Sequence, residues 1–255
     1  MGMDTPLPNF DLMGRRALVT GSSRGIGLAM AHALASFGAE VVLNGRTAET
    51  LESATDQLRQ QDLPVSCARF DVTSEEQIGH ASAQIGPIDI LVNNAGIHRR
   101  APLEDMSLED WEKVISTNLT SAFLVSRAFV PSMIEKRAGK IINVCSLMSD
   151  LARPTTGNYA ASKGGLRMLT RAMCGEWAQH NIQINGIGPG YIETELNAKL
   201  VADPKFDSWI RGRTPAGRWG KVSDLTGAVV FMAGSASSYL NGQVIVIDGG
   251  LSAVI

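Results

Sequence analysis

The sequence Ala17-Leu18-Val19-Thr20-Gly21-Ser22-Ser23-Arg24-Gly25-Ile26-Gly27 joins a short apolar run to three glycines near the start of the chain. Residues 17–20 are typical of a buried strand, and residues 25–37 of a helix. Glycines between a strand and a helix let the backbone turn tightly and approach a phosphate, which the helix N-terminus attracts. This spacing therefore predicts a nucleotide-binding turn. The turn would consist of Gly21, Ser23, Arg24, Gly25, Ile26 and Gly27.

The alternation of strands and helices continues along the chain. Several apolar runs are continuous in Val, Ile and Leu, which indicates strands that are buried on both faces of a parallel sheet. The expected strands are 17–20, 41–43, 65–70, 88–92, 140–144, 183–187 and 244–247. The expected helices are 25–37, 48–60, 75–84, 108–136, 159–179 and 223–233. These units predict an α/β fold with a Rossmann-like, doubly wound parallel sheet of about seven strands.

No linker or repeat divides the 255 residues, so we expect a single domain over residues 1–255. The segment 188–221 lacks a clear strand and is too long for an ordinary connection, which predicts a substrate-binding loop. Apolar residues at helix-like spacing indicate that this loop packs as a lid. They are Leu196, Leu200, Phe206 and Trp209.

Composition excludes several classes of protein. The net charge is −2 without a basic run, so no nucleic-acid partner is expected. No apolar run approaches the roughly 20 residues that span a membrane, and residues 1–12 lack the pattern of a secretion signal. Three scattered cysteines and four isolated histidines predict neither disulfides nor a metal site. We therefore expect a cytoplasmic protein without a metal.

The end of the second expected strand bears on the choice of cofactor. An acidic residue there would bond the ribose 2′-hydroxyl of NAD, but the chain has Asn44-Gly45-Arg46 instead. The guanidinium of Arg46, with that of Arg24, can pair with the 2′-phosphate of NADP. We predict NADP, with NAD the less favoured cofactor. The alternative is that both arginines are solvated surface residues.

Two polar side chains share one face of the fifth expected helix. Tyr159 and Lys163 are separated by four residues, and a nearby cation lowers the pKa of a phenol, so Tyr159 could exchange a proton with a carbonyl or an alcohol. Ser146 follows a strand, at an edge of the sheet where ligands bind, and could bond the same oxygen. Asn118 lies within a predicted helix, either on a solvated face or as a polar hook that holds a water behind Lys163. The alternatives for Tyr159 and Ser146 are a buried structural tyrosine and a turn residue.

These motifs, in this order, resemble the short-chain dehydrogenase/reductase family over essentially the whole chain. The matching positions are residues 20–27, 93–96, 118, 146, 159, 163 and 189–190. The resemblance implies an NAD(P)-dependent oxidoreductase of a secondary alcohol and a ketone. It implies that Tyr159 is the acid/base, that Ser146 positions the substrate oxygen, that Lys163 binds the nicotinamide ribose and that Asn118 supports a proton relay. It also implies cofactor contacts for Asp71, Val72, Asn94, Ala95, Gly96, Pro189, Gly190, Ile192 and Thr194.

A narrower resemblance concerns the substrate. Residues 97–104, 151–154 and 213–220 are similar to those of family members that act on a sugar acid. Arg100 and Arg153 follow two strand ends beside Ser146 and Tyr159, and an arginine can hold a carboxylate with two hydrogen bonds. We therefore expect these four residues to contact the substrate. The alternative is that the arginines face solvent or a subunit interface.

Other functions remain open at this point. A 3-oxoacyl-carrier-protein reductase or another sugar or polyol dehydrogenase would share the same catalytic residues, and a nucleotide-sensing protein could share the fold. The family resemblance also implies a homotetramer, with the helices 108–136 and 159–179 at one interface.

Overall fold

The computed structural model describes residues 9–254, apart from the side chain of Leu196. Its centre is a seven-stranded parallel sheet in the order β3-β2-β1-β4-β5-β6-β7. The strands are β1 (Arg16–Val19), β2 (Glu40–Gly45), β3 (Val65–Arg69), β4 (Ile90–Asn93), β5 (Gly139–Val144), β6 (Ile182–Pro189) and β7 (Val244–Ile247). The predicted fold class is confirmed, and each predicted strand overlaps an observed one.

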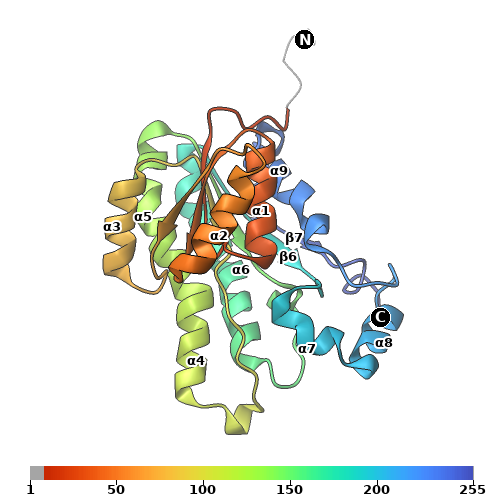
Figure 1. Ribbon diagram of the computed structural model, residues 1–255. Helices are drawn as coiled ribbons and strands as arrows, with labels where there is room; N and C mark the ends of the chain where they lie inside the picture. Colours follow the sequence, from red (N-terminus) through yellow and green to blue (C-terminus); the bar gives the residue numbers. More distant parts are fainter. Residues whose placement is uncertain (1–8, 255) are drawn as a thin grey trace.

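Helices cover both faces of the sheet (Figure 1). The helices are α1 (Gly25–Ser36), α2 (Ala48–Arg59), α3 (Glu75–Ile85), α4 (Leu108–Ile115), α5 (Ser121–Lys136), α6 (Gly157–Trp177), α7 (Ala198–Val201), α8 (Pro204–Arg213) and α9 (Thr226–Ala233). Residues of α1, α2 and α9 join one hydrophobic core, and residues of α3, α5 and α6 join a second core on the opposite face. Burial on both faces explains why the strands are continuously apolar.

Two segments differ in detail from the prediction. Residues 108–136 are not one regular helix, because a π-helical turn at Ser116–Thr120 separates α4 from α5. Segment 188–221 begins inside β6 and contains α7 and α8, and a bridge between Ile192 and Gly220 brings its two ends together. Among residues 9–254, no helix is long and apolar enough to cross a membrane.

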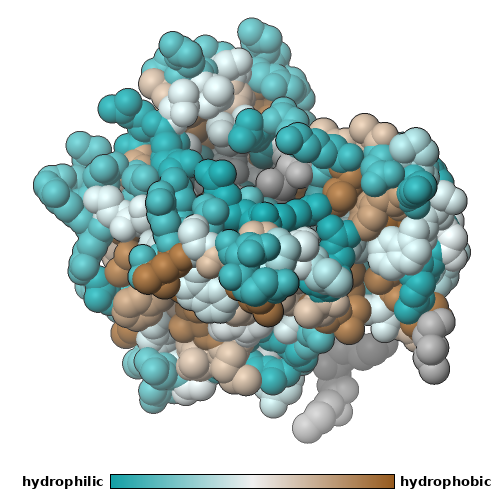
Figure 2. Space-filling view, turned by 90° about the horizontal axis from the view of Figure 1, so that it is seen from below, coloured by the Kyte–Doolittle hydropathy of each residue, from teal (hydrophilic) through white to brown (hydrophobic). Residues whose placement is uncertain are grey.

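A crevice forms where the chain reverses its direction of winding. The strand β1 pairs with β2 on one side and with β4 on the other, so the connections that follow β1 and β4 diverge. This is the point at which open α/β sheets bind ligands. A cavity of about 760 Å³ lies there, and hydrophilic side chains border a hollow on this side of the surface (Figure 2).

Candidate active site

The glycine turn forms one end of the cavity. A Cβ atom on Gly27 would lie 2.4 Å from Nδ2 of Asn94 and 2.5 Å from the Gly21 carbonyl oxygen, so this position requires glycine. Gly25 has a φ of +58°, and a Cβ atom there would meet no atom within 4 Å. The turn therefore leaves open space directly before α1. Among the residues that the structure describes, no side chain caps the first amides of α1, which leaves them available to an anion.

Hydrogen bonds between the ends of β1 and β4 hold this turn in place. The Thr20 hydroxyl accepts bonds from the amides of Asn94 and Ala95, at 3.0 and 3.1 Å. The Asn94 side chain donates to the carbonyl oxygens of Thr20 and Gly21, at 2.9 and 2.8 Å. These bonds hold the loop that contains Gly96 against the glycine turn, and residues of both line the cavity.

Asn44 and Arg46 occupy different environments although they are neighbours in sequence. Asn44 is buried, and its side chain accepts a bond from the Gly21 amide and donates to the Ala68 and Phe70 carbonyl oxygens. Its amide is thus engaged in fixing the glycine turn. The Arg46 side chain is 64% exposed and forms an ion pair with Asp71 at 3.7 Å. Only Arg46 of this pair presents a cation at the cavity.

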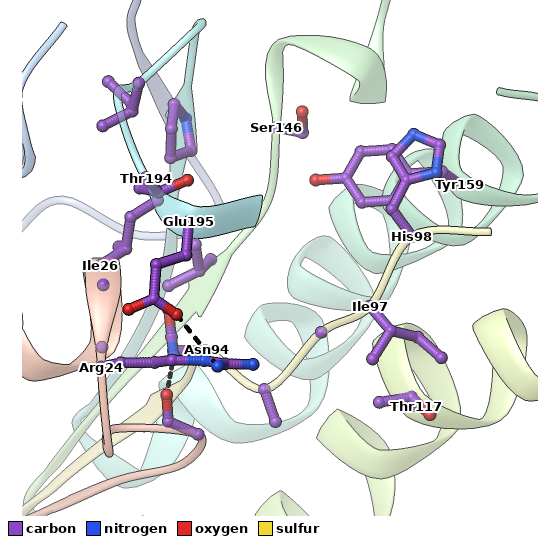
Figure 3. A pocket seen from close by; sticks show the side chains of 18 of the residues that line it. Arg24, Ile26, Asn94, Ile97, His98, Thr117, Ser146, Tyr159, Thr194 and Glu195 are labelled. Carbon is purple, nitrogen blue, oxygen red and sulfur yellow. Dashed lines mark hydrogen bonds and ion pairs between the residues drawn. The ribbon is translucent and has the colours of Figure 1, made fainter. Parts of the chain in front are cut away.

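Ser146, Tyr159 and Lys163 come together at the other end of the cavity. Ser146 follows β5, whereas Tyr159 and Lys163 share one face of α6, as their spacing predicts. The Tyr159 hydroxyl points toward the Ser146 hydroxyl (Figure 3). Lys163 is buried, its Nζ donates to the Val144 carbonyl oxygen at 2.6 Å, and it lies 5.8 Å from the centre of the Tyr159 ring.

The acidity of Tyr159 differs from the expectation. The neighbouring cation was expected to lower its pKa. Tyr159 is half-buried on the cavity wall, and removal of its phenolate from water raises the pKa, whereas a hydrogen bond with Ser146 opposes this only in part. Burial also lowers the pKa of Lys163, to about 8. In this structure the phenol therefore holds its proton at neutral pH.

Asn118 lies behind the cavity instead of lining it. It is buried in the π-helical turn, so the alternative of a solvated face is wrong. Its side chain accepts a bond from the Ile97 amide at 2.8 Å and donates to the Ile97 carbonyl oxygen at 3.0 Å and to the Ser162 hydroxyl at 3.1 Å. The side chain of Asn118 is thus a buried polar anchor, as the second alternative predicts, but the groups it bonds belong to the protein. All other predicted site residues line the cavity.

A cationic rim borders the catalytic end. Arg99 pairs with Asp110 at 3.8 Å, whereas Arg100 and Arg153 have no carboxylate partner in the part of the chain that the structure describes. Arg100 and Arg153 line the same cavity, and burial together with the charge of Arg153 lowers the pKa of Arg100. Arg153 also stacks over the ring of Phe206 at 4.7 Å. The rim can therefore receive an anion.

Segment 188–221 forms one wall of this end. Rings of Tyr191, Phe206, Trp209 and Trp219 contact one another, with centres 5.4 to 6.3 Å apart. Leu147, next to Ser146, belongs to the same apolar cluster. The predicted packing role of Leu200 and Phe206 agrees with this cluster, whereas the side chain of Leu196 lies outside the described residues.

Three residues of the cavity region were not singled out from the sequence. His98 lies against Tyr159, and Glu195 forms an ion pair with Arg24 at 3.0 Å across the mouth of the cavity (Figure 3). Arg69 and Arg46 line a smaller adjoining cavity of about 320 Å³. Arg69 could have been found, because β3 pairs with β2 so that it lies opposite Gly45. His98 lies within the stretch 97–104 of the narrower resemblance, but the sequence predicts no role for it or for Glu195.

Two features define the class of the protein. One is the open space before the N-terminus of α1, and the other is the phenol of Tyr159 beside the Ser146 hydroxyl and the Lys163 ammonium group. It is an oxidoreductase of CH–OH groups that binds a dinucleotide. Residues 15–205 match the family described as short chain dehydrogenase. The chain belongs to this family.

Individual relatives are similar over nearly their whole length. Gluconate 5-dehydrogenase from Gluconobacter oxydans (strain 621H) is 52% identical over 247 residues, 95% of this chain and 96% of the relative. The 5-keto-D-gluconate 5-reductase of Escherichia coli (strain K12) is 47% identical over 246 residues, 95% of this chain and 97% of the relative. The crystal structure of a gluconate 5-dehydrogenase from Burkholderia cenocepacia J2315 in complex with NADP and tartrate superposes with a TM-score of 0.93 at 49% identity, over 96% of this chain and 98% of that one.

Proposed function

We propose that the protein is an NADP-dependent gluconate 5-dehydrogenase, which interconverts D-gluconate and 5-dehydro-D-gluconate. One observation carries the proposal. The hydroxyl groups of Tyr159 and Ser146 face each other beside two arginines that lack carboxylate partners among the described residues. A sugar acid has both groups that such a site would bind, a carboxylate and a ketone or secondary alcohol. The names of the two sequence relatives support the same substrate pair.

The residues of the catalytic end would divide the work of ketone reduction. Tyr159 donates its proton to the ketone oxygen as this oxygen gains negative charge, and the raised pKa of the phenol keeps that proton available at neutral pH. Ser146 donates a hydrogen bond to the same oxygen and fixes its position. Arg100 and Arg153 hold the carboxylate at the other end of the substrate. In the oxidation direction Tyr159 takes the proton back.

The cofactor would extend from the glycine turn to Tyr159. The space before Gly25 and the uncapped start of α1 fit a pyrophosphate. Arg46, with Arg24 and Arg69 close by, fits the 2′-phosphate of NADP, and Asp71 and Val72 would contact the adenine. Asn94, Ala95, Gly96, Pro189, Gly190, Ile192 and Thr194 would line the nicotinamide half, and Lys163 would bond its ribose. When bound, NADPH supplies the hydride that reduces the carbonyl carbon.

We also propose the setting in which the protein works. Residues 1–255 would form one cofactor-binding and catalytic domain, with 188–221 as the substrate loop. The free state of the three cysteines fits the reducing cytoplasm. The large apolar side chains of Phe123 on α5 and Met168 on α6 are 42% and 60% exposed, which supports a homotetramer that covers these helices. Light scattering in solution tests the last point.

A panel of initial rates tests the substrate. With NADPH, the panel compares 5-ketogluconate, 2-ketogluconate, a neutral ketose and a 3-oxoacyl thioester. We expect the highest kcat/KM for 5-ketogluconate, and an Arg100→Ala variant should raise its KM far more than the KM for the neutral ketose. A preference for the thioester would instead identify a carrier-protein reductase, and equal effects of Arg100→Ala on both ketones would contradict the carboxylate contact.

A further inference from the structure

The imidazole of His98 lies flat against the phenol ring of Tyr159. The two ring centres are 4.5 Å apart and the ring planes differ by only 4° (Figure 3). A centre distance of this size with parallel planes is an offset stack, a favoured arrangement of aromatic rings. The stack covers one face of the ring whose hydroxyl points toward Ser146. His98 comes from the loop after β4, so the contact joins two elements that are 61 residues apart in sequence.

The backbone on both sides of His98 is fixed by side-chain amides. Asn118 bonds the amide and the carbonyl oxygen of Ile97, at 2.8 and 3.0 Å. The side-chain Nδ2 of Asn158 donates to the Arg99 carbonyl oxygen at 2.9 Å, and the side-chain Oδ1 of the same residue accepts a bond from the Tyr159 amide at 2.7 Å. One side chain therefore ties the backbone of the histidine loop to the backbone of Tyr159. This arrangement sets the distance between the two rings independently of the stack.

The charged groups around His98 favour a neutral ring. Burial and the positive charges of Arg100 and Arg153 lower the pKa of His98 to about 4, and a backbone contact with Arg99 opposes them only in part. Its Nδ1 atom is buried and bonds no group among the described residues. The phenol of Tyr159, which stacks on the imidazole, is uncharged as well. The imidazole thus presents a flat, uncharged face to the phenol at working pH, although two cations lie nearby.

We propose that His98 is a positioning residue for Tyr159. The imidazole fixes the plane of the phenol ring, and with it the direction in which the hydroxyl points toward Ser146 and the substrate oxygen. Without the stack the ring gains rotational freedom about its side-chain bonds, and fewer bound substrates meet the hydroxyl at the right angle. The inference rests on the proposed role of Tyr159 as the acid/base of the reaction.

Three variants of the full-length protein separate the stack from other roles of His98. His98→Ala removes the ring, His98→Leu keeps apolar volume without a flat face, and His98→Phe keeps the flat face without nitrogen atoms. With 5-ketogluconate and saturating NADPH, we expect kcat to fall about 10-fold in His98→Ala and His98→Leu, with KM changed less than about 2-fold. His98→Phe should restore kcat to within about 3-fold of the original protein. His80→Ala, on the exposed surface of α3, serves as a control that leaves kcat unchanged.

Each other outcome contradicts the proposal. Equal losses in His98→Phe and His98→Ala would show that the nitrogen atoms matter and the flat face does not. A rise in KM at constant kcat would show that His98 contacts the substrate directly, and an unchanged His98→Ala would show that the stack has no role. Thermal unfolding followed by circular dichroism verifies that the variants are folded.

A second measurement does not depend on the substrate. The ultraviolet difference spectrum between the original protein and Tyr159→Phe reports the ionisation of Tyr159 alone. Because His98 shields one face of the phenol, His98→Ala should lower the apparent pKa of Tyr159, and His98→Phe should leave it in place. If sugar acids fail as substrates but this pattern holds, the proposed substrate is wrong and the positioning role stands. An unchanged pKa in His98→Ala would mean that the two rings are not in contact in solution, which would overturn the positioning role.

Discussion

At the scale of single residues, the catalytic end of the cavity uses burial to control protons. The environment of Tyr159 raises its pKa, so the phenol is a proton donor at neutral pH and becomes an acceptor only when a base or alkaline pH assists. Ser146 is also occupied, because its hydroxyl accepts a bond from the Met148 amide at 3.0 Å. That bond uses an acceptor position of the hydroxyl and not its proton, which can pass from the Tyr159 oxygen to a substrate oxygen as hydrogen-bond donor.

Replacing Tyr159 with Phe should remove the proton donor while keeping the ring. We expect kcat for ketone reduction to fall by about 10²–10⁴-fold, the range of general acid catalysis. The affinity for NADPH, followed by fluorescence titration, should change little, because the stack on His98 and the packing remain. Robust turnover by the variant would remove Tyr159 from the proposed chemistry.

Lys163 should lower the stability of the cofactor-free protein, because folding buries the positive charge of its ammonium group. Its folded pKa of about 8 lies below the unfolded value of about 10.4, so the folded state loses its proton first as pH rises. The destabilisation by the buried charge is fully present below pH 8, declines between about pH 8 and 10.4, and is absent above pH 10.4. Lys163→Met should thus raise the free energy of unfolding at pH 7 by about 1–2 kcal/mol, after the lost bond to Val144 is subtracted.

Urea unfolding at pH 7 and at pH 10 checks this sign. The original protein should gain stability relative to Lys163→Met as pH rises. A variant that is less stable at both pH values would mean that the bond to the Val144 carbonyl oxygen outweighs the buried charge.

Arg46 is expected to determine the choice between NADP and NAD. Its exposed guanidinium needs only to leave Asp71 to bind a 2′-phosphate. Arg46→Ala should lower kcat/KM for NADP by about 10–100-fold, as for a lost charge-assisted bond, and change that for NAD by less than about 3-fold. Arg59→Ala on α2 is a matched control, because Arg59 pairs locally with Asp56. Equal losses with both cofactors would contradict the assignment.

At the scale of elements, the π-helical turn between α4 and α5 is the local feature that most affects the site. It places Asn118 in the protein interior, where one side chain bonds both polar backbone groups of Ile97. Single-turn π-helices of this kind are often found at functional sites. The loop that holds Gly96, Ile97 and His98 therefore depends on a residue two elements further along the chain.

Asn118→Ala should leave the amide and the carbonyl oxygen of Ile97 without partners. We expect a loss of about 1–3 kcal/mol in the free energy of unfolding and a larger, about 10-fold or greater, loss of kcat. Denaturant titration and initial rates measure the two effects. Ser82→Ala on α3 is the control, because the Ser82 hydroxyl donates to the Gly79 carbonyl oxygen and the residue does not line the cavity. Loss of stability with unchanged kcat would show that the loop position does not affect catalysis.

The same elements show what the sequence can predict and what it cannot. Continuous Val/Ile/Leu runs located the strands, and the glycine turn and the Tyr159/Lys163 spacing placed their residues correctly, because both patterns are local. The π-helical turn was missed, because one inserted residue hardly changes helical periodicity over the long segment 108–136. His98 was missed because its partner is distant in sequence. The pKa of Tyr159 was expected in the wrong direction, because burial depends on the whole fold.

At the scale of the whole molecule, the cavity is closed by contacts between distant parts of the chain. The segment 188–221 packs through Phe206 and Trp219 against Leu147, and therefore against the loop that contains Ser146. On the cofactor side, Glu195 reaches across to Arg24 in the glycine turn. The first contact is apolar and buried, whereas the second is an exposed ion pair, which contributes about 1 kcal/mol or less. The mouth over the cofactor should therefore open more easily than the wall at the substrate end.

Hydrogen exchange can test this difference in the native protein. We expect amides of residues 191–213 to exchange more slowly when NADP and gluconate are both bound, because the lid then closes over ligands that contact it. In the cofactor-free protein, Glu195→Gln should accelerate exchange near residues 194–199 a few-fold, since it removes the ion pair with Arg24, and should leave the amides of α8 unchanged. Glu193→Gln, two residues earlier, is the matched control. Protection that is identical with and without both ligands would mean that segment 188–221 is a fixed wall of the site, with substrate entering by another route.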